Sequence, residues 1–324
     1  MGAAHARGYS AAGAEIVGVA DADETAAARL AVAYRARPVT TPEALFNLGL
    51  DAVSICLPHS LHHRCALMAC ERGIHILVEK PLAISIREAL EIRKACRDSG
   101  IRCMVGFSQR FQDGFCDLKD SIQRDILGPI DLSVDYLSAG PAVPGWYLQQ
   151  PAAGGGILIT GSIHAVDRLR WLLNSEVRSV HGLIDRHHDA NQVESTGIIT
   201  LEFRSGSQAV LIGHRSSLRW HRKRHWFELQ GSKGEAAVEL NEASIVQRLS
   251  ITTSEGTQER NYLLDDPFER EIAEFIDAIR HHRDPIPGLE DGVTSLAVIM
   301  AAYESARKGK TIYMESWEEA YKLC

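Results

Sequence analysis

The chain has 324 residues, of which 45% are hydrophobic and 24% charged, and its formal net charge is −7. This composition is typical of a globular protein with room for two domains. The negative charge argues against general binding to nucleic acid or to an anionic membrane, because either would need a basic surface. The sequence holds no run of about 18 uncharged apolar residues, so we expect no membrane-spanning helix.

The seven cysteines are scattered and form no CxxC pair. Free thiols in a reducing cytoplasm are therefore the simplest interpretation, and we expect no structural zinc. The first ten residues, MGAAHARGYS, show neither a long apolar run nor a signal-peptide cleavage pattern. These features predict a cytoplasmic protein.

Strand-like and helix-like segments alternate through the first hundred residues. The predicted strands cover 15–20, 51–58, 75–81 and 101–107, and the predicted helices cover 23–36, 41–49, 62–73 and 85–100. Thr41 and the Ser85–Glu88 pair are helix N-terminal signals, and Gly100 ends a helix. This alternation indicates βαβ units, and hence a doubly wound parallel α/β sheet. Nucleotides bind such sheets at the carboxyl ends of the strands.

Beyond about residue 128 the pattern changes to strand-like runs separated by turn residues. These runs cover 130–140, 179–186, 196–203, 207–215, 224–232 and 236–241. We expect one large, mostly antiparallel sheet in an α+β domain, interrupted by a helix over 161–173, and two last helices over 267–282 and 290–308 that pack back on the first domain. The predicted division is a dinucleotide-binding domain over 1–110 and a substrate and oligomerisation domain over 111–324.

Asp21 ends the first predicted strand. A carboxylate at this point of a dinucleotide fold accepts hydrogen bonds from the adenosine ribose hydroxyls. It would repel a 2′-phosphate, and the next residues (Ala22, Asp23 and Glu24) offer no arginine to offset that repulsion. The sequence therefore predicts NAD, with NADP disfavoured. The alternative interpretation is that Asp21 caps the following helix.

Gly2 stands 19 residues before Asp21, where the last glycine of a G-x-G-x-x-G fingerprint is expected. The strand and the glycines that come before it in a complete fold have no counterpart in the sequence. The missing strand would lie in the middle of the sheet, so its loss would leave two strand edges unpaired. Two interpretations stay open: the sequence starts inside the fingerprint of a longer protein, or the protein is truncated and its cofactor site is damaged.

A series of segments, in order from Met1 almost to the C-terminus, carries a family resemblance. They are MGAAHARGY, CLPHSLHH, VEKP (78–81), VGFSQRF (105–111), GGGILITGSIHAVDRLRWLL (154–173), GSKGEAAVE, FEREIAEFIDAI and EDGVTSLAVIMAAYESARKGK. Together they resemble the glucose–fructose oxidoreductase and inositol dehydrogenase family (Gfo/Idh/MocA), in which VEKP is the most diagnostic tetrapeptide. The resemblance implies a Rossmann-type domain and an NAD(P)-dependent dehydrogenase acting on CH–OH groups of a sugar, inositol or related polyol.

The resemblance implies roles for three catalytic candidates. Lys80 would lie beside the nicotinamide and bond the substrate hydroxyl, where an ammonium stabilises developing alkoxide charge. His164 would be the general base or its partner, which suits an imidazole. Many members carry aspartate four residues before this histidine, but here the residue is Thr160. Threonine can bond a substrate hydroxyl and cannot take its proton at neutral pH, so proton transfer would rest on His164, Lys80 or water.

Further site residues follow from the same motifs. Pro58, His59 and His62 end the CLPHSLHH segment, and Glu79 precedes Lys80, so all four are expected on the nicotinamide side of the cofactor. Arg110, Trp146 and Tyr147 are expected as walls of the substrate site. Asp167 is a further substrate-site candidate that either orients the His164 ring or points to solvent.

The resemblance also implies subunit pairing through one face of the large sheet, and hence a homodimer or homotetramer. Two competing functions stay open. One is a family member with other reductase chemistry, such as imine or dihydrodiol turnover. The other is a non-catalytic regulator or scaffold with weakened cofactor binding, which the missing glycine strand and Thr160 would favour and the retained Lys80 and His164 oppose.

Two groups of residues, a basic run and several histidine pairs, have ordinary structural interpretations. The basic run 214–226 lies between strands in an acidic protein, so a solvated face or a subunit contact is expected, with an acidic or phosphorylated substrate as the alternative. The pairs His62–His63, His187–His188 and His281–His282 are adjacent residues, which point in different directions and make poor paired ligands. We expect no metal.

Overall fold

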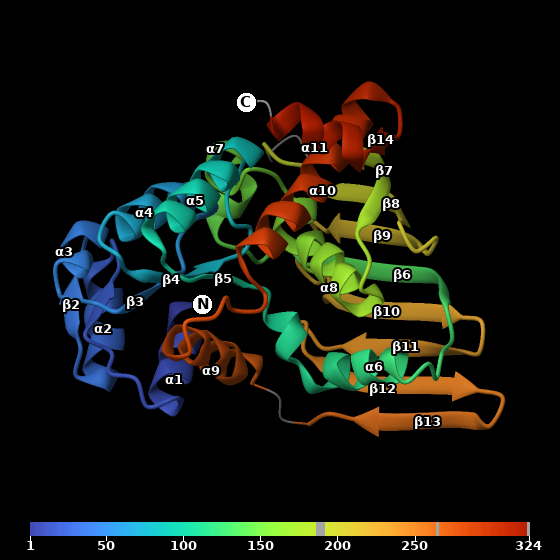
Figure 1. Cartoon of the computed structure of the whole chain (residues 1–324), viewed down its shortest axis with the longest axis horizontal. Coiled ribbons are helices and arrows are strands. Elements are labelled where there is room, and N and C mark those ends of the chain that lie inside the picture. Colours follow the sequence, from blue (N-terminus) through green and yellow to red (C-terminus); the bar gives the residue numbers. More distant parts are fainter. Residues whose placement is uncertain (186–191, 264–265, 323–324) are drawn as a thin grey trace.

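The computed structural model describes residues 1–185, 192–263 and 266–322. Figure 1 shows the N-terminal strands and helices on one side and a broad nine-stranded sheet on the other, with α6, α8 and α10 beside the sheet. The pair His187–His188 lies outside the described residues. None of the described helices is both long and apolar enough to span a membrane.

The N-terminal half alternates strands and helices as predicted. Its elements are α1 (Gly2–Ala11), β1 (Gly18–Ala20), α2 (Glu24–Tyr34), β2 (Arg37–Val39), α3 (Pro42–Phe46), β3 (Ala52–Ile55), α4 (His62–Cys70), β4 (His75–Glu79), α5 (Ile86–Ser99) and β5 (Cys103–Gly106). All strand pairs here are parallel. The three-residue strand β2 contains Pro38 and was not predicted, because a proline lowers the strand signal.

The parallel strands form two separate pieces, β1-β2 and β3-β4-β5. Among the described residues β1 pairs only with β2, and β3 pairs only with β4, so the prediction of two unpaired strand edges is confirmed. In the standard strand order 3-2-1-4-5-6, the position between these two pieces belongs to the first strand. Helix α1 packs against α9 (Pro267–Arg280) and β3.

Local signals fix the helix ends around the candidate site. Ser85 Oγ accepts a 3.2 Å hydrogen bond from the backbone N–H of Glu88, as the capping signal predicted. Gly100 ends α5 with φ of 69°, a left-handed conformation that favours glycine. In β4, Ile76, Leu77 and Val78 are fully buried, and each such side chain contributes about 1.5–3 kcal/mol on burial. This apolar strand fixes the position of Lys80 at its end.

The C-terminal half is built on the nine-stranded sheet, in the order β13-β12-β11-β10-β6-β9-β8-β7-β14. Its strands are β6 (Ile130–Ala139), β7 (Val177–Asp185), β8 (Thr196–Phe203), β9 (Gln208–Arg215), β10 (Arg224–Gly231), β11 (Gly234–Leu240), β12 (Val246–Thr253), β13 (Gly256–Asn261) and β14 (Ile312–Tyr313). The pair β6/β9 is parallel and the other pairs are antiparallel. The predicted mostly antiparallel sheet is therefore confirmed.

The C-terminal helices either cover the inner face of this sheet or connect it to the N-terminal half. They are α6 (Asp113–Gln123), α8 (Ile163–Leu173), α9, α10 (Leu289–Lys308) and α11 (Met314–Lys322), with shorter turns at Ser108–Phe111 and α7 (Gln150–Ala153). Helix α9 packs against α1, and α10 packs against α5 and β5. The helix predicted over 161–173 begins at Ile163, after a π-helical turn over Leu158–Ser162.

Candidate active site

Lys80 follows β4 directly, and the Lys80–Pro81 peptide bond is cis. The Lys80 Nζ atom donates a 2.7 Å hydrogen bond to the backbone carbonyl of Thr160. Thr160 lies in the π-helical turn that leads into α8, so this bond joins the two halves of the molecule. The ammonium has three N–H donors, and the other two have no partner among the described residues. They are available to a substrate hydroxyl.

The turn that holds Thr160 is shaped by a buried carboxylate. Glu194 accepts hydrogen bonds from the backbone N–H of Gly156 at 2.6 Å and of Leu158 at 3.1 Å, and from the Tyr303 hydroxyl at 2.8 Å. A Cβ at Gly156 would lie 1.9 Å from the Glu194 carbonyl oxygen, so only glycine fits there. The carboxylate thus satisfies the orphan N–H groups at the start of the turn. Sequence reasoning missed Glu194, because its neighbours carry no motif.

The Thr160 side chain is already engaged within the protein. Its hydroxyl donates a 2.6 Å hydrogen bond to the Gly156 carbonyl, and it accepts from Arg215 Nη2 at 3.4 Å. Because its proton is directed at Gly156, the hydroxyl can act toward a ligand only as an acceptor. Thr160 therefore lies between Lys80 and Arg215 and carries no charge of its own.

His164 lies one helical turn beyond Thr160, at the start of α8. Its Nδ1 atom is buried without a hydrogen-bond partner among the described residues, and its ring lies edge-on to Phe107 with centroids 6.0 Å apart. Burial, followed by the positive charge of Lys80, lowers the pKa of His164 well below its usual value of 6.5. The imidazole is therefore neutral near pH 7 and can accept a proton.

Asp167 neither orients His164 nor points to solvent, so both expectations for this residue are wrong. It is 2% exposed and accepts two hydrogen bonds from Arg110, from Nε at 2.8 Å and from Nη2 at 2.6 Å. Arg110 Nη2 also donates to Asp291 on α10 at 2.8 Å. Burial opposes the charge on Arg110, but the two carboxylates raise its pKa above the usual value. Arg110 and Asp167, which were expected to contact the substrate, therefore connect α8 to α10.

Glu79 lies beneath Lys80 in a buried polar cluster. His5 Nε2 donates to Glu79 Oε1 at 3.1 Å, and His5 Nδ1 lies 3.0 Å from the Ser54 hydroxyl. Burial alone would raise the pKa of Glu79, but the hydrogen bond and charge of His5 and the charge of Lys80 lower it. Glu79 is thus a buried carboxylate that supports the strand end, and its side chain turns toward α1.

His62 was expected to contact the cofactor, but it is fully buried. Its Nδ1 atom lies 2.8 Å from the Pro81 carbonyl and its Nε2 atom 2.9 Å from the Leu57 carbonyl. The ring thereby ties the end of β3 to the residue after Lys80. The structure corrects the expected role of His62 from ligand contact to positioning.

His59, Trp146 and Tyr147 come together as an aromatic cluster. The His59 ring lies 4.8 Å from the Trp146 ring and 5.6 Å from the Tyr147 ring, and its Nδ1 donates to the Ala153 carbonyl at 2.8 Å. Burial, followed by the charge of Lys80, lowers the pKa of His59 to about 3. Pro58 begins the turn that carries His59, with φ of −52°. The neutral ring of His59 braces the partly exposed side chains of Trp146 and Tyr147.

At the other end of the expected cofactor site, Asp21 is exposed directly after β1. Its Oδ1 accepts a 2.9 Å hydrogen bond from the backbone N–H of Asp23, and Asp23 caps α2 by accepting from Thr25 and Ala26. The alternative in which Asp21 is the helix cap is therefore wrong. Gly2 begins α1, and a Cβ added there would meet nothing within 4 Å. An exposed carboxylate after β1 and an open helix N-terminus fit a dinucleotide.

A buried arginine on α8, Arg168, was not expected from the sequence. It is 0% exposed, donates to Gln109 and Asp135, and lies between the rings of Phe115 and Phe227 at 4.6 and 4.4 Å. The family motif singled out the neighbouring residue Asp167 as a site residue. That the Arg168 side chain is also buried follows from the packing and not from the motif. The pair Arg168–Asp135 fixes α8 on the sheet.

The basic run 214–226 has two different environments. Arg219 and Trp220 are exposed, whereas Arg215 and His225 are buried. The expectation of a solvated face therefore holds only for the loop between β9 and β10. Within residues 1–185, 192–263 and 266–322 no group of three or more His, Cys, Asp or Glu side chains is placed to hold a metal ion.

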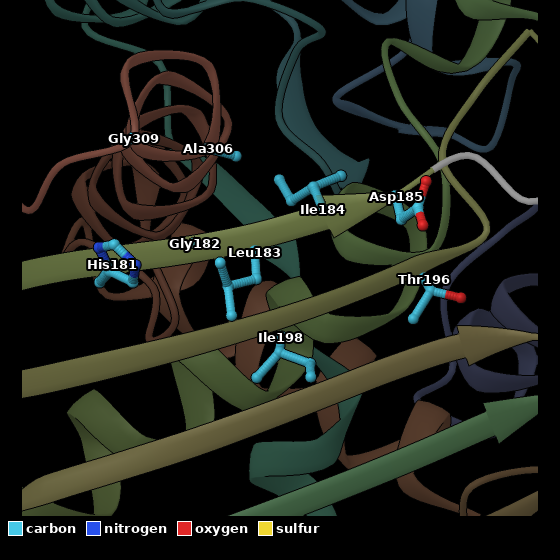
Figure 2. Close-up of a pocket in the computed structure, with 9 residues that line it drawn as sticks. All are labelled: His181, Gly182, Leu183, Ile184, Asp185, Thr196, Ile198, Ala306 and Gly309. Carbon is cyan, nitrogen blue, oxygen red and sulfur yellow. The ribbon is translucent and has the colours of Figure 1, made fainter.

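A hollow of about 520 Å³ is lined by residues of β7 and β8 and by the C-terminal end of α10. Figure 2 shows Leu183 and Ile198 projecting on neighbouring strands there, with His181 and Thr196 nearby. None of the predicted catalytic or cofactor residues lines it. This hollow is therefore not part of the candidate active site.

Comparison with known proteins places this geometry in a family. Residues 1–107 match the model described as "Oxidoreductase family, NAD-binding Rossmann fold", and residues 119–314 match "Oxidoreductase family, C-terminal alpha/beta domain". The chain belongs to the GFO/IDH/MocA oxidoreductase family. The resemblance inferred from VEKP and the accompanying motifs is therefore confirmed, and with it a Rossmann-type nicotinamide-binding domain.

Two curated relatives and two solved structures show the range of this family. Inositol 2-dehydrogenase of Rhizobium meliloti (strain 1021) is 31% identical, over 96% of this chain and 96% of that protein. The scyllo-inositol 2-dehydrogenase (NAD(+)) of Bacillus subtilis (strain 168) is 27% identical, over 84% and 80%. Levoglucosan dehydrogenase in complex with NADH and levoglucosan superposes with a TM-score of 0.88 at 21% identity, over 97% of this chain and 96% of that one. An oxidoreductase domain protein from Kribbella flavida gives 0.87 at 21%, over 97% and 96%. These two structures establish the shared fold.

Proposed function

We propose that the chain transfers hydride between a nicotinamide cofactor and a hydroxyl-bearing carbon of a sugar, inositol or related polyol. The observation that carries the proposal is the Lys80–Thr160 hydrogen bond of 2.7 Å, which holds an ammonium with two free donors at the end of β4, beside the neutral His164. The similarity to inositol dehydrogenases supports a CH–OH substrate.

The side chains divide the work of carbinol oxidation. The reaction removes a hydride from carbon and a proton from oxygen, and the bound nicotinamide supplies the hydride acceptor. Lys80 bonds the substrate oxygen and stabilises its developing negative charge. His164 takes the hydroxyl proton, because its depressed pKa keeps it neutral near pH 7. Thr160 contributes an accepting oxygen and takes no part in proton transfer.

For the cofactor we propose NAD in preference to NADP. The exposed Asp21 carboxylate would accept hydrogen bonds from the ribose hydroxyls and repel a 2′-phosphate. The first N–H groups of α1, beginning at Gly2, would face the pyrophosphate. Pro58 and His59 would line the nicotinamide side, with Glu79 and His62 holding Lys80 in place. Trp146 and Tyr147 would form a wall of the substrate site.

We further propose a homodimer or homotetramer joined through the outer face of the nine-stranded sheet. Trp226, Tyr136, Ile212, Ile198 and Leu183 form one cross-strand row on that face. Leu183 is 61% exposed, and the rings of Trp226 and Tyr136 stack with centroids 5.5 Å apart. A contiguous apolar surface of this kind is typical of subunit contacts. The division at residue 110 and a cytoplasmic location remain predictions.

Titration of the full chain with NADH, followed by energy transfer from its tryptophans, tests the cofactor half of the proposal. Micromolar binding, with NADPH binding at least about tenfold weaker, is the expected result and corresponds to a preference of about 1.4 kcal/mol. Absence of NADH binding by a folded chain would favour the non-catalytic alternative. A substrate screen with imines and dihydrodiols beside polyols then separates the other reductase chemistries.

A further inference from the structure

Arg215 is a buried cation without a counter-ion. It ends β9, is 6% exposed, and its Nε atom has no hydrogen-bond partner among the described residues. Within the described residues its side chain forms one hydrogen bond, from Nη2 to the Thr160 hydroxyl at 3.4 Å. No described carboxylate forms an ion pair with it. A buried guanidinium in this state is costly unless a ligand pairs with it.

Two further cations, Lys80 and Lys223, interact with Arg215 or with the residue that it contacts. Lys80 donates to the carbonyl of Thr160, while Arg215 reaches the hydroxyl of the same residue. Lys223, in the loop before β10, is half-buried and forms no ion pair with a described carboxylate. Burial, followed by the charges of Lys80 and Arg215, lowers the pKa of Lys223 to about 8. Lys80 and Arg215 therefore bring two positive charges to the same residue, Thr160.

No carboxylate among the described residues forms an ion pair with Arg215 or Lys223. Glu194 influences Arg215, but its oxygens accept from Gly156, Leu158 and Tyr303. Glu242 influences Lys223 from an exposed position, and Glu79 is hydrogen-bonded to His5. A neutral polyol would offer Arg215 no ion pair. Guanidinium groups bind carboxylate and phosphate oxygens in a paired, bidentate manner.

We propose that Arg215 forms an anion subsite beside Thr160, and that the substrate is a polyhydroxy compound carrying a carboxylate or phosphate group. The inference rests on the proposed dehydrogenase function and narrows its substrate class. Arg215 bonds the anionic substituent, and Lys80 bonds the hydroxyl that is oxidised. Specificity for an acidic over a neutral sugar is thus set by Arg215.

The test uses related compounds that differ in whether they carry an anionic substituent. We would measure kcat/KM of the full chain with NAD for glucose, glucuronate and glucose 6-phosphate, and for glucitol and gluconate, at low and high ionic strength. At least a tenfold preference for an anionic member over its neutral partner is expected, and salt should reduce it because it screens the ionic contact. The glucuronate and glucose 6-phosphate arms distinguish a carboxylate from a phosphate.

Variants assign the preference to a residue. Arg215→Gln should lower kcat/KM for the anionic compound by about 10- to 100-fold and leave the neutral compound within about twofold, whereas Arg219→Gln, in the exposed loop, should change neither. Thr160→Asp would supply a carboxylate to Arg215 and should abolish the preference, while the uncharged Thr160→Asn should keep it. Circular dichroism and thermal melting show that each variant is folded.

The outcomes separate the two proposals. Turnover of neutral compounds equal to or better than that of their acids, with the ratio unchanged in Arg215→Gln, overturns the anion subsite and leaves the dehydrogenase intact. If no compound is oxidised, the proposed function fails, and titration with gluconate and with inorganic phosphate decides on the subsite. Binding that is lost in Arg215→Gln and kept in Arg219→Gln supports it, and absence of binding by the wild-type chain overturns it.

Discussion

The ammonium of Lys80 lies 2.7 Å from the carbonyl oxygen of Thr160. This bond places a residue at the end of β4 against the turn that precedes α8. His164, the proposed acid–base group, is one helical turn further along the chain, and the charge of Lys80 contributes to lowering its pKa. The candidate catalytic site therefore requires both halves of the chain to be folded and packed together.

His164 is expected to be essential for turnover but not for cofactor binding. His164→Asn should lower kcat by about 10²- to 10⁴-fold, because it removes the proton acceptor. Since the pKa of His164 lies well below 6.5 in the folded protein, kcat/KM of the wild type should show no loss of activity from its protonation near pH 6.5. The acid limb should appear at lower pH. A pH profile with an inflection at 6.5 that disappears in His164→Asn would contradict this assignment.

Asp21 is expected to set the cofactor preference. Asp21→Ser removes the charge that repels a 2′-phosphate, so NADPH affinity should rise and NADH affinity should fall, each by about tenfold or less. Fluorescence titration with both cofactors measures the change. Asp23→Ser is the matched control, because serine can still cap α2. An unchanged NADH to NADPH ratio in Asp21→Ser would remove Asp21 from the cofactor site.

Glu271 should destabilise the protein as the pH rises. It is 0% exposed, and neither carboxylate oxygen has a hydrogen-bond partner among the described residues; Oε2 lies 4.0 Å from His5 Nε2. Burial, with the charge of Glu79, raises its pKa well above 4.5. The folded state therefore favours the protonated form, and this contribution is fully present below pH 4.5 and lost as the pH rises through the folded-state pKa.

Glu271→Gln should accordingly gain stability over the wild type above pH 4.5, by about 1.4 kcal/mol for each pH unit up to the folded-state pKa. Urea unfolding at pH 5, 7 and 9 measures the difference. Glu269→Gln, on the exposed side of the same helix, should follow the wild type. Parallel pH dependence of Glu271→Gln and the wild type would show that Glu271 is not a buried, protonated acid.

The outer face of the large sheet should mediate self-association. Trp226→Glu places a charge in the apolar row beside Tyr136, so the mutant should sediment as a smaller species than the wild type while keeping its circular dichroism. Trp220, which is 78% exposed in the neighbouring loop, provides the control in Trp220→Glu. A monomeric wild type at micromolar concentration would refute the proposed assembly.

The sequence was sufficient where local chemistry determines structure. The strand–helix alternation, the caps at Thr41 and Ser85 and the buried strand before Lys80 follow from periodicity and helix-end signals. Strands β12 and β13 were missed because they are rich in polar residues, and β13 is exposed along its whole length. An edge strand with no buried face carries little alternation to detect.

Long-range pairing explains why the site was only partly predicted. The motif pointed to Arg110 and Asp167 as substrate contacts, but their side chains pair with each other across 57 residues. Arg215 appeared as one basic residue in a charged run, and only the packing of β9 against the Thr160 turn distinguishes it from Arg219. Such pairings depend on which side chains are buried together, and spacing along the chain does not record that.

The central claim is tested most directly by the rate of NADH formation from NAD and a panel of polyols and sugar acids, measured for the wild-type chain and for Lys80→Ala. The wild type should oxidise at least one of these compounds, and Lys80→Ala should lose about 10²- to 10⁴-fold in kcat with unchanged NADH binding and melting temperature. Equal turnover by the two proteins would contradict the assignment of Lys80 as the residue that acts on the substrate hydroxyl.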